Sequence, residues 1–326
     1  MIKNNIIAKF FIAAVVTLGV VIGIVYLYVW NNNSKLQGKL VFSETYNIGT
    51  LIDKIELVSK EETVTLLQKD SYWLIENKYN YYADFLQVNN LLNTLNKSIY
   101  SIKFPYDEKT ANEKLLKNPD KLEENSGVLI KTYSQGKVID EIIVGVPDES
   151  KNYHFSRNLK DNNIWLISEK FDIPLYARDW IVKPIVSIPG KYIETIQIDE
   201  KKVNRLDEFT PFYNEKNEVA NVDVFTDTLL RLFVIDAIPE DEFVKNFTDD
   251  VKVKKMTITS FVGLVFDLDL YYSNNNKVWC KIKLSTTSLP IYLVNDYIND
   301  NQFLYDGWYF EISPEQGHIL RDFRLQ

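Results

Sequence analysis

Apolar and polar residues alternate along residues 54–76, which is the pattern of short, half-buried strands. The segments "KIELV", "ETVTLL" and "YWLIE" each alternate in this way and are rich in β-branched or aromatic residues. A period of two places the apolar side chains on one face of a sheet. We therefore predict three consecutive strands at the start of the folded region.

A helical period replaces the alternation after Asp84. Asp84 is a suitable N-cap, and apolar residues recur three or four positions apart beyond it. The apolar face of the predicted helix, which would cover the sheet, is formed by Val88, Leu91, Leu92, Leu95, Ile99 and Ile102. A second, shorter helix is predicted for "KTANEKLLK", stopped by Pro119.

Two hairpins are predicted in the block that begins near Ser126. The segment "GVLIKTYSQGKVIDEIIVG" would turn at Gln135-Gly136, and "NYHFSRNLKDNNIWLIS" would turn at residues 161–163. Prolines then bracket "LYARDWIV". We interpret that segment as a short helix leading to a connection.

The same plan restarts near residue 191. The segment "YIETIQI" resembles "LIDKIEL", with Ile196 in the place of Ile55. Asp223 could cap a helix that matches the one after Asp84, and residues 252–284 form a long hairpin about residues 274–276. We interpret this as a degenerate internal duplication, although two unrelated sheets with convergent patterning would look alike. The predicted fold class is α+β, with mostly antiparallel sheets, covering helices and two related halves.

Residues 10–30 form an uncharged run, "FFIAAVVTLGVVIGIVYLYVW". As a helix the run would measure about 31 Å, which matches a hydrocarbon core of about 30 Å. It lacks the small-residue cleavage site of a signal peptide, and Tyr26, Tyr28 and Trp30 are typical of an interfacial belt. We therefore expect a retained transmembrane anchor.

The expected topology leaves the short N-terminal tail in the cytoplasm and exports the rest of the chain. Lys3 and Lys9 precede the run, and Lys35 and Lys39 follow it, so the charge bias is slight. The predicted division is residues 1–30 for the tail and anchor, 31–47 for a linker, and 48–190 and 191–326 for two β-rich halves. The expected location is the bacterial inner (cytoplasmic) membrane, crossed once, with the bulk extracytoplasmic (periplasmic).

Charge argues against nucleic acid as a partner. Two of the 37 basic residues and none of the 45 acidic residues precede Trp30, so the remainder carries a formal charge of 35 minus 45, or −10. An acidic domain fits neither nucleic acid nor anionic lipid head groups well. Cys280 is the single cysteine, and its alternating neighbours indicate a small core residue rather than a catalytic thiol.

Few residues suggest catalysis. His154 and His318 have no second metal ligand at a suitable spacing, which favours polar packing over a metal site. Asp267 and Asp269 share a strand face and could act as an acid–base pair, but an ordinary solvated strand explains them better. The "KYNYY" segment at residues 78–82 could stack sugars, although packing above the helix is the simpler interpretation. We predict no catalytic residue, cofactor or metal.

Three stretches together resemble the family of the domain of unknown function numbered 4340. They are "IDKIELVSKEETVTLLQKDSYWLIENKYNYYADFLQVNNLLNTL", "IIVGVPDESKNYHFSRNLKDNNIWLI" followed by "ARDWIVKPIV", and "DGWYFEISPEQGHILRDF". Trp73, Asp84 and Trp308 stand at the marked places of that family. The resemblance implies one N-terminal membrane helix and an exported β-rich domain, with Trp73 and Trp308 largely buried. The Asn- and Lys-rich loops depart from the family pattern.

The resemblance also implies a functional setting. Members of that family are linked with ABC-type transporters of the gliding-motility kind, so subunits of such a transporter are the implied partners. We therefore expect a non-enzymatic accessory subunit. The alternative is an envelope module that binds glycans or peptides through exposed tyrosines or an open sheet edge. Gly19 and Gly23 form a G-x-x-x-G spacing in the anchor, which predicts a helix–helix interface with a membrane partner.

Overall fold

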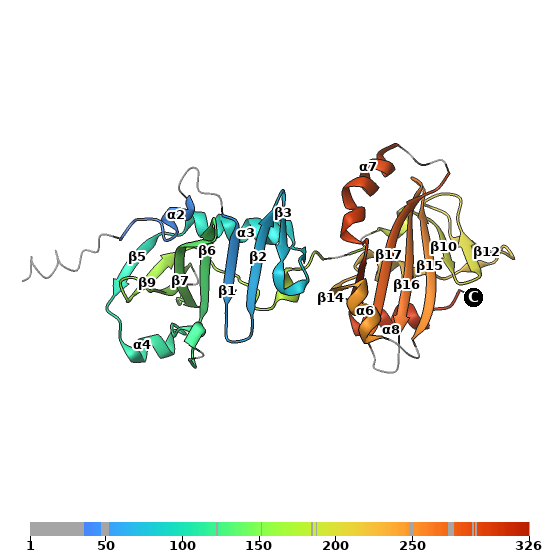
Figure 1. Cartoon of the computed structure of the whole chain (residues 1–326). Helices are drawn as coiled ribbons and strands as arrows, with labels where there is room; N and C mark the ends of the chain where they lie inside the picture. Colours follow the sequence, from blue (N-terminus) through green and yellow to red (C-terminus); the bar gives the residue numbers. More distant parts are fainter. Residues whose placement is uncertain are drawn as a thin grey trace, which may run out of the picture. The chain divides into compact units, whose positions relative to one another are not determined.

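The protein is α+β and contains two nine-stranded sheets. The computed structural model describes residues 36–46, 52–121, 123–150, 152–183, 185–186, 188–247, 251–272, 277–288, 290 and 292–325. The first sheet occupies residues 54–168 and the second occupies residues 193–312 (Figure 1). The expected boundary at residue 190 lies between the sheets, and as a domain boundary it stays a prediction.

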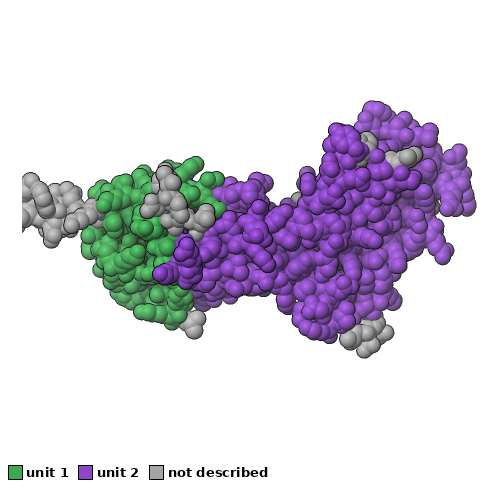
Figure 2. All heavy atoms as spheres, turned by 45° about the horizontal axis from the view of Figure 1, so that its top comes forward, with its two compact units in different colours: residues 1–51, 92–131, 138–171 green, residues 52–91, 132–137, 172–326 purple. Residues whose placement is uncertain are grey.

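The chain also divides into two compact units, which Figure 2 colours separately. Unit 1 contains residues 1–51, 92–131 and 138–171, and unit 2 contains residues 52–91, 132–137 and 172–326. This division runs through the strands of the first sheet, so the units and the sheets are different descriptions of the chain.

The two sheets have the same strand order. The first reads β4-β3-β2-β1-β6-β7-β8-β9-β5, and the second reads β13-β12-β11-β10-β15-β16-β17-β18-β14. Subtracting nine from each label of the second sheet reproduces the first. Helices also follow the fourth and fifth strands of each set, which is the pattern that a duplicated unit would produce.

Seven strands of the first sheet lie close to the predicted ones, whereas β4 and β5 were not predicted as strands. Its strands are β1 (Lys54–Val58), β2 (Thr63–Lys69), β3 (Tyr72–Ile75), β4 (Tyr81–Tyr82), β5 (Tyr100–Phe104), β6 (Val128–Ser134), β7 (Lys137–Pro147), β8 (Tyr153–Asn158) and β9 (Asn163–Ser168). Gln135 and Gly136 have φ angles of 51° and 72°, so the predicted β6–β7 turn is confirmed. Trp73 is buried as expected, whereas Trp308 is half-buried and contacts Tyr81.

The first helix is shorter than its apolar spacing predicted. Asp84 caps α3 (Phe85–Lys97), since its Oδ1 accepts hydrogen bonds from the Leu86 and Gln87 amides at 2.9 and 3.2 Å. Ile99 and Ile102 lie beyond the helix, because the chain pairs with β9 as β5 from Tyr100 onward. Pairing with β9 therefore gives the chain from Tyr100 onward an extended conformation instead of the predicted helical one.

The second helix also ends early. Asp107 caps α4 (Glu108–Glu113), and the chain leaves the helix before Leu115, whose φ is 56°. Pro119 instead begins a 3₁₀ turn, η2 (Pro119–Lys121). The other 3₁₀ turns are η1 (Glu76–Lys78), η3 (Ala177–Trp180), which is the short helix predicted there, η4 (Gly190–Tyr192) and η5 (Gln302–Leu304).

The second sheet carries helices on both faces. Its strands are β10 (Ile193–Ile198), β11 (Lys201–Asn204), β12 (Phe212–Asn214), β13 (Val219–Ala220), β14 (Val234–Pro239), β15 (Lys252–Ser260), β16 (Leu264–Tyr272), β17 (Val278–Thr286) and β18 (Trp308–Ile312). Its helices are α5 (Asp223–Leu230), α6 (Glu240–Asn246), α7 (Tyr292–Asn301) and α8 (Pro314–Asp322). Strands β15, β16 and β17 form an antiparallel meander rather than a single hairpin, and residues 274–276 lie outside the described residues.

Alternation along β16 and β17 decides what each face of the second sheet buries. Phe266, Leu268 and Leu270 are buried on one face, where Gly317 of α8 packs against Val278. On the other face, the Phe243 ring of α6 packs against aromatic residues of three strands. Ile55 and Ile196, the residues matched in the sequence, are both completely buried, one in each sheet.

The segment after the expected anchor is part of unit 1. Gly38 and Val41 donate backbone hydrogen bonds to Tyr100 and Ser98, both at 2.8 Å, and Phe42 is fully buried. A short helix, α2 (Ser43–Tyr46), follows. Residues 38–45 therefore belong to the fold, although we expected a polar linker over residues 31–47.

The expected membrane segment, residues 10–30, lies outside the described residues, as do Gly19 and Gly23. Within the described part of the chain, no helix is both long and apolar enough to cross a membrane.

Candidate functional site

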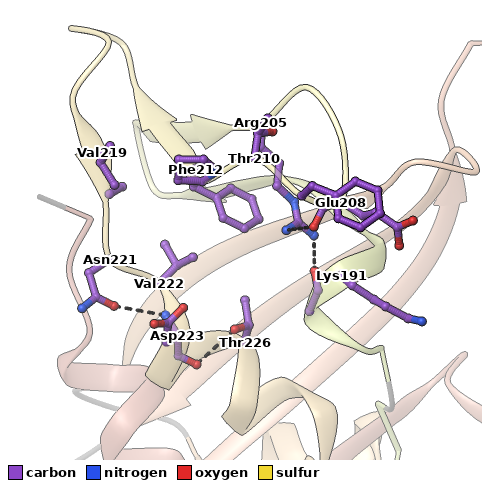
Figure 3. A pocket seen from close by; sticks show the side chains of 14 residues that line it. Lys191, Arg205, Glu208, Thr210, Phe212, Val219, Asn221, Val222, Asp223 and Thr226 are labelled. Carbon is purple, nitrogen blue, oxygen red and sulfur yellow. Dashed lines mark hydrogen bonds between the residues drawn. The ribbon is translucent and has the colours of Figure 1, made fainter.

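A pocket of about 660 Å³ opens beside β12 and β13, at one edge of the second sheet (Figure 3). Its walls come from η4, the loop after β11, β12, β13 and the first turn of α5. Phe212, Ala220 and Val222 are buried and supply its apolar lining. All of these residues belong to unit 2.

Arg205 holds one wall in place. Its Nε donates to the Ile193 carbonyl at 2.7 Å, and its guanidinium also donates to the Gly190 carbonyl. The guanidinium carbon lies 4.6 Å from the centroid of the Phe212 ring. Burial lowers the pKa of Arg205 from its usual value, and Asp207 and Glu208 oppose that shift. Because carbonyls and an aromatic ring occupy much of its guanidinium, Arg205 mainly positions the wall.

The loop from Arg205 to Pro211 is ordered by its own side chains. Asp207 Oδ1 accepts hydrogen bonds from the Phe209 and Thr210 amides at 2.9 and 3.0 Å. Thr210 Oγ1 accepts from the Leu206 amide at 3.2 Å. This fixed turn nevertheless leaves Leu206 and Phe209 85% and 88% exposed. The Phe209 side chain is thus held in solvent at the mouth of the pocket, and Leu206 is exposed in the same turn.

Strand β13 lies at the edge of the sheet and runs along the pocket. The Asn214 amide donates to the Glu218 carbonyl at 2.9 Å, so that pair is hydrogen-bonded. The alternation of an antiparallel ladder makes Tyr213–Val219 the next, non-hydrogen-bonded pair. The backbone N–H and C=O of Val219 therefore face away from β12, toward the free edge. The Val219 side chain is 66% exposed.

The first turn of α5 completes the pocket. We expected Asp223 to cap this helix, but it is the first helical residue, and Val222 occupies the cap position without a side-chain hydrogen bond. The Asp223 amide donates to Asn221 Oδ1 at 3.3 Å, and Thr226 Oγ1 donates to the Asp223 carbonyl at 3.0 Å. Asn221 thus supplies a side-chain oxygen to an amide at the start of the helix, which is the function that we expected of Asp223.

The rim carries both signs of charge. Lys191, Glu208 and Asp223 all line the pocket, and in Figure 3 the Lys191 side chain extends away from it. Among the described residues, no group of three or more His, Cys, Asp or Glu side chains could hold a metal ion. The arrangement offers a cavity with apolar and polar walls beside a strand edge, which are features of a binding site.

The residues that the sequence singled out lie elsewhere. His154 is buried in β8 with Nδ1 3.3 Å from the Glu169 carbonyl oxygen, and burial lowers its pKa, while His318 is in α8 of the other unit. Asp267 and Asp269 face Lys283 and Lys281 across the ladder, and Thr257 donates to Asp267 at 2.7 Å. These contacts agree with the solvated-strand interpretation.

The remaining candidates are packed. Cys280 is fully buried in β17, and burial strongly raises the pKa of its thiol. In the "KYNYY" segment, Tyr81 is buried and donates to the Leu304 carbonyl at 3.1 Å, and Tyr82 contacts Phe303. Tyr79 is half exposed. These tyrosines therefore favour the packing interpretation.

The pocket was missed because no local motif marks it. Its walls come from segments of chain that are not contiguous, between residues 190 and 226. The available signal was Leu206 and Phe209 within a polar stretch, with Asp207 and Thr210 three apart, a spacing typical of a hydrogen-bonded turn.

No family model matches the chain, and neither a curated protein nor a solved structure matches it. The fold therefore defines the class of protein only as α+β with two sheets of identical strand order, and the function has to be argued from the site.

Proposed function

We propose that the protein is a non-enzymatic accessory subunit that holds an extended segment of a partner protein along β13. Residues 10–30 anchor it in the bacterial inner membrane, and the bulk of the chain is extracytoplasmic. The partner is a subunit of an ABC-type transport complex, as the family resemblance implies. Neither cofactor nor metal takes part in this role.

The observation that carries the proposal is the free edge of β13 beside a pocket with both apolar and polar walls. An extended peptide recognises such an edge through backbone hydrogen bonds, and pockets for alternate side chains supply specificity. Val219 presents its backbone groups there, and Phe212 and Val222 line the cavity next to it. The exposed Phe209 ring would add apolar contact at the rim.

The first experiment is co-purification from mild detergent with the candidate transporter subunits. Phe209→Ser removes the most exposed aromatic ring at the pocket, and Val219→Pro removes the edge N–H. Both changes should lower partner recovery at least 10-fold. Tyr292→Ser is the matched control, because Tyr292 is 73% exposed but lies in α7, away from the pocket lining. Equal recovery by wild type and both pocket variants would refute the edge as the binding site.

The second experiment tests the anchor as an interface. Two glycines four residues apart lie on one helix face and allow close helix approach. Gly19→Leu combined with Gly23→Leu should release the partner while membrane insertion is retained. Recovery of no transporter subunit by wild-type protein would count against the accessory role itself.

A glycan-binding module is the second candidate. The Phe209 ring is exposed beside the polar side chains of Lys191 and Glu208, a combination that suits a sugar face. A panel of envelope oligosaccharides measured by calorimetry separates the candidates. Saturable sugar binding that is lost in Phe209→Ser and kept in Val219→Pro would favour this alternative.

A further inference from the structure

An apolar patch lies on one face of the first sheet, within unit 1. We call it the outer patch, and its residues are Ile102, Phe104, Tyr153, Phe155 and Leu166. Ile102 is 49% exposed, and Phe104 and Tyr153 are each 36% exposed. Phe155 and Leu166 are half-buried between them.

Strand register places the outer patch on a single face. Ile102 pairs with Leu166, and Leu166 pairs with Phe155 on the next strand. Directly opposed residues share a face, and so do residues two apart on a strand, which adds Phe104 and Tyr153. Three neighbouring strands thus contribute one continuous apolar surface.

The opposite face of the same strands is core. Trp165, Ser156 and Ile167 alternate with the patch residues and are completely buried. The α4 region covers part of this face, where Ala111 and Leu116 pack on Ile164 and Phe155 and the Lys114 ammonium lies 4.7 Å from the centroid of the Phe155 ring. Large apolar surfaces on soluble domains usually mark an interaction site, so the exposed part of the outer patch indicates such a site.

The chain reaches the outer patch directly from the expected anchor. The apolar run ends at Trp30, and Gly38 already donates a hydrogen bond to Tyr100, the first residue of β5. Eight Cα–Cα steps separate these points, so they lie at most about 29 Å apart even when the chain is fully extended. Ile102 lies two residues further along β5, which adds about 7 Å. With residues 10–30 as the expected anchor, this tether keeps Ile102 within about 36 Å of the end of the apolar run.

We infer that the outer patch rests on the membrane, with Ile102, Phe104 and Tyr153 inserted among the lipid head groups. The inference rests on the proposed anchor, which supplies the tether. The contact is apolar, because the exported chain carries a formal charge of −10 and anionic head groups would repel it. Aromatic and aliphatic side chains at a head-group interface are favourable without a basic surface. The contact should accordingly not depend on salt.

The test uses the full chain in vesicles of zwitterionic lipid containing a spin-labelled phospholipid. Cys280 is fully buried, so a cysteine introduced by Ile102→Cys can be labelled selectively with an environment-sensitive fluorophore. We expect quenching by the spin label at least 3-fold stronger than in the control, together with a blue shift. Both effects should be equal at low salt and at high salt.

The control variant is Glu61→Cys, in the exposed turn between β1 and β2. Strand β1 is five places from β5 in the sheet, or about 24 Å at a usual strand spacing. If the chain stays in the vesicles after alkaline extraction and both labels are quenched equally, the patch contact is overturned and the anchor is retained. Quenching that appears only with anionic lipid and disappears in salt would also overturn it. Loss of the chain on alkaline extraction would overturn both the anchor and the contact. A label at Ile102 that is shielded only after a partner protein is added would assign the patch to that partner.

Discussion

Lys254 Nζ lies 3.1 Å from the carbonyl oxygen of Leu320, on the core face of the second sheet. The same ammonium donates to the Arg321 carbonyl at 3.0 Å and to the Phe323 carbonyl. Lys254 is only 3% exposed. Backbone carbonyls at the end of a helix have no intrahelical partner, and here a strand lysine satisfies those at the end of α8.

Lys254→Met should destabilise the protein and change the pH dependence of its stability. The carbonyls of α8 would lose their donor, which costs about 1–3 kcal/mol for buried acceptors. Burial, with the nearby Arg324, lowers the pKa of Lys254 to about 8, so between pH 8 and about 10.5 the unfolded chain binds more protons than the folded one. This group therefore makes the free energy of unfolding rise with pH across that window.

Urea unfolding at pH 7.5 and pH 9.5 measures the effect. The stability difference between wild type and Lys254→Met should widen at the higher pH. Lys255→Met is the matched control, because Lys255 is exposed and points to the other face of β15. Identical pH dependence in wild type and Lys254→Met would contradict the assignment.

Asp140 should control how tightly the N-terminal segment is held. Its Oδ2 accepts a hydrogen bond from the Thr45 amide at 2.8 Å, and the side chain is buried. Asp140→Ala removes that bond, at a cost of about 1 kcal/mol. Amide hydrogen exchange at Gly38, Val41 and Thr45 should become roughly 5-fold faster.

Asp140→Asn separates the hydrogen bond from the charge. Burial raises the pKa of Asp140, although Thr45 opposes the shift, so the folded state retains the proton over a range where the unfolded state has lost it. The contribution of Asp140 to the free energy of unfolding therefore falls as pH rises from about 4 through its folded pKa. Asn can accept the same bond without that loss, so exchange in Asp140→Asn should be as slow as in wild type at pH 7. Exchange in Asp140→Asn as fast as in Asp140→Ala would contradict the contact.

The stacked pair Phe243–Tyr309 should anchor α6. The two ring centroids lie 3.8 Å apart with an angle of 6° between the planes, and Phe243 is 5% exposed. Phe243→Ala should cost about 3 kcal/mol, since it leaves a cavity in an aromatic cluster. Val244→Ala on the same helix should stay within about 0.5 kcal/mol, because Val244 is 57% exposed. Thermal unfolding of the two variants side by side provides the measurement.

The proposed anchor predicts a defined topology. A reporter fused after Gln326 should be active only outside the cytoplasm, and the mature protein should retain Met1 or Ile2 at its N-terminus. N-terminal sequencing of the membrane fraction checks the second point. A mature chain that begins near Asn31 would mean that residues 10–30 are a cleaved signal.

Local pattern was sufficient for most elements of the fold. Alternation located β1, β2, β3 and β10, and the Gln135-Gly136 pair located a turn that only residues tolerant of positive φ adopt easily. Asp84 marked the start of α3 because a cap needs only its own side chain and the next few amides. These features depend on neighbours in sequence, so the sequence determines them.

Long-range contacts decided the rest. Ile99 and Ile102 continue the helical spacing of α3, yet pairing with β9 placed the chain in a strand, because a sheet edge satisfies backbone groups that a fraying helix end does not. The pocket required η4, the loop after β11 and α5 to meet, and Lys254 could occupy a core position only because carbonyls some seventy residues later accept its hydrogen bonds. The sequence by itself thus determined the local elements and the apolar run at residues 10–30. The strand order, the free edge of β13 and the outer patch were decided by tertiary structure, because each depends on groups that are distant along the chain.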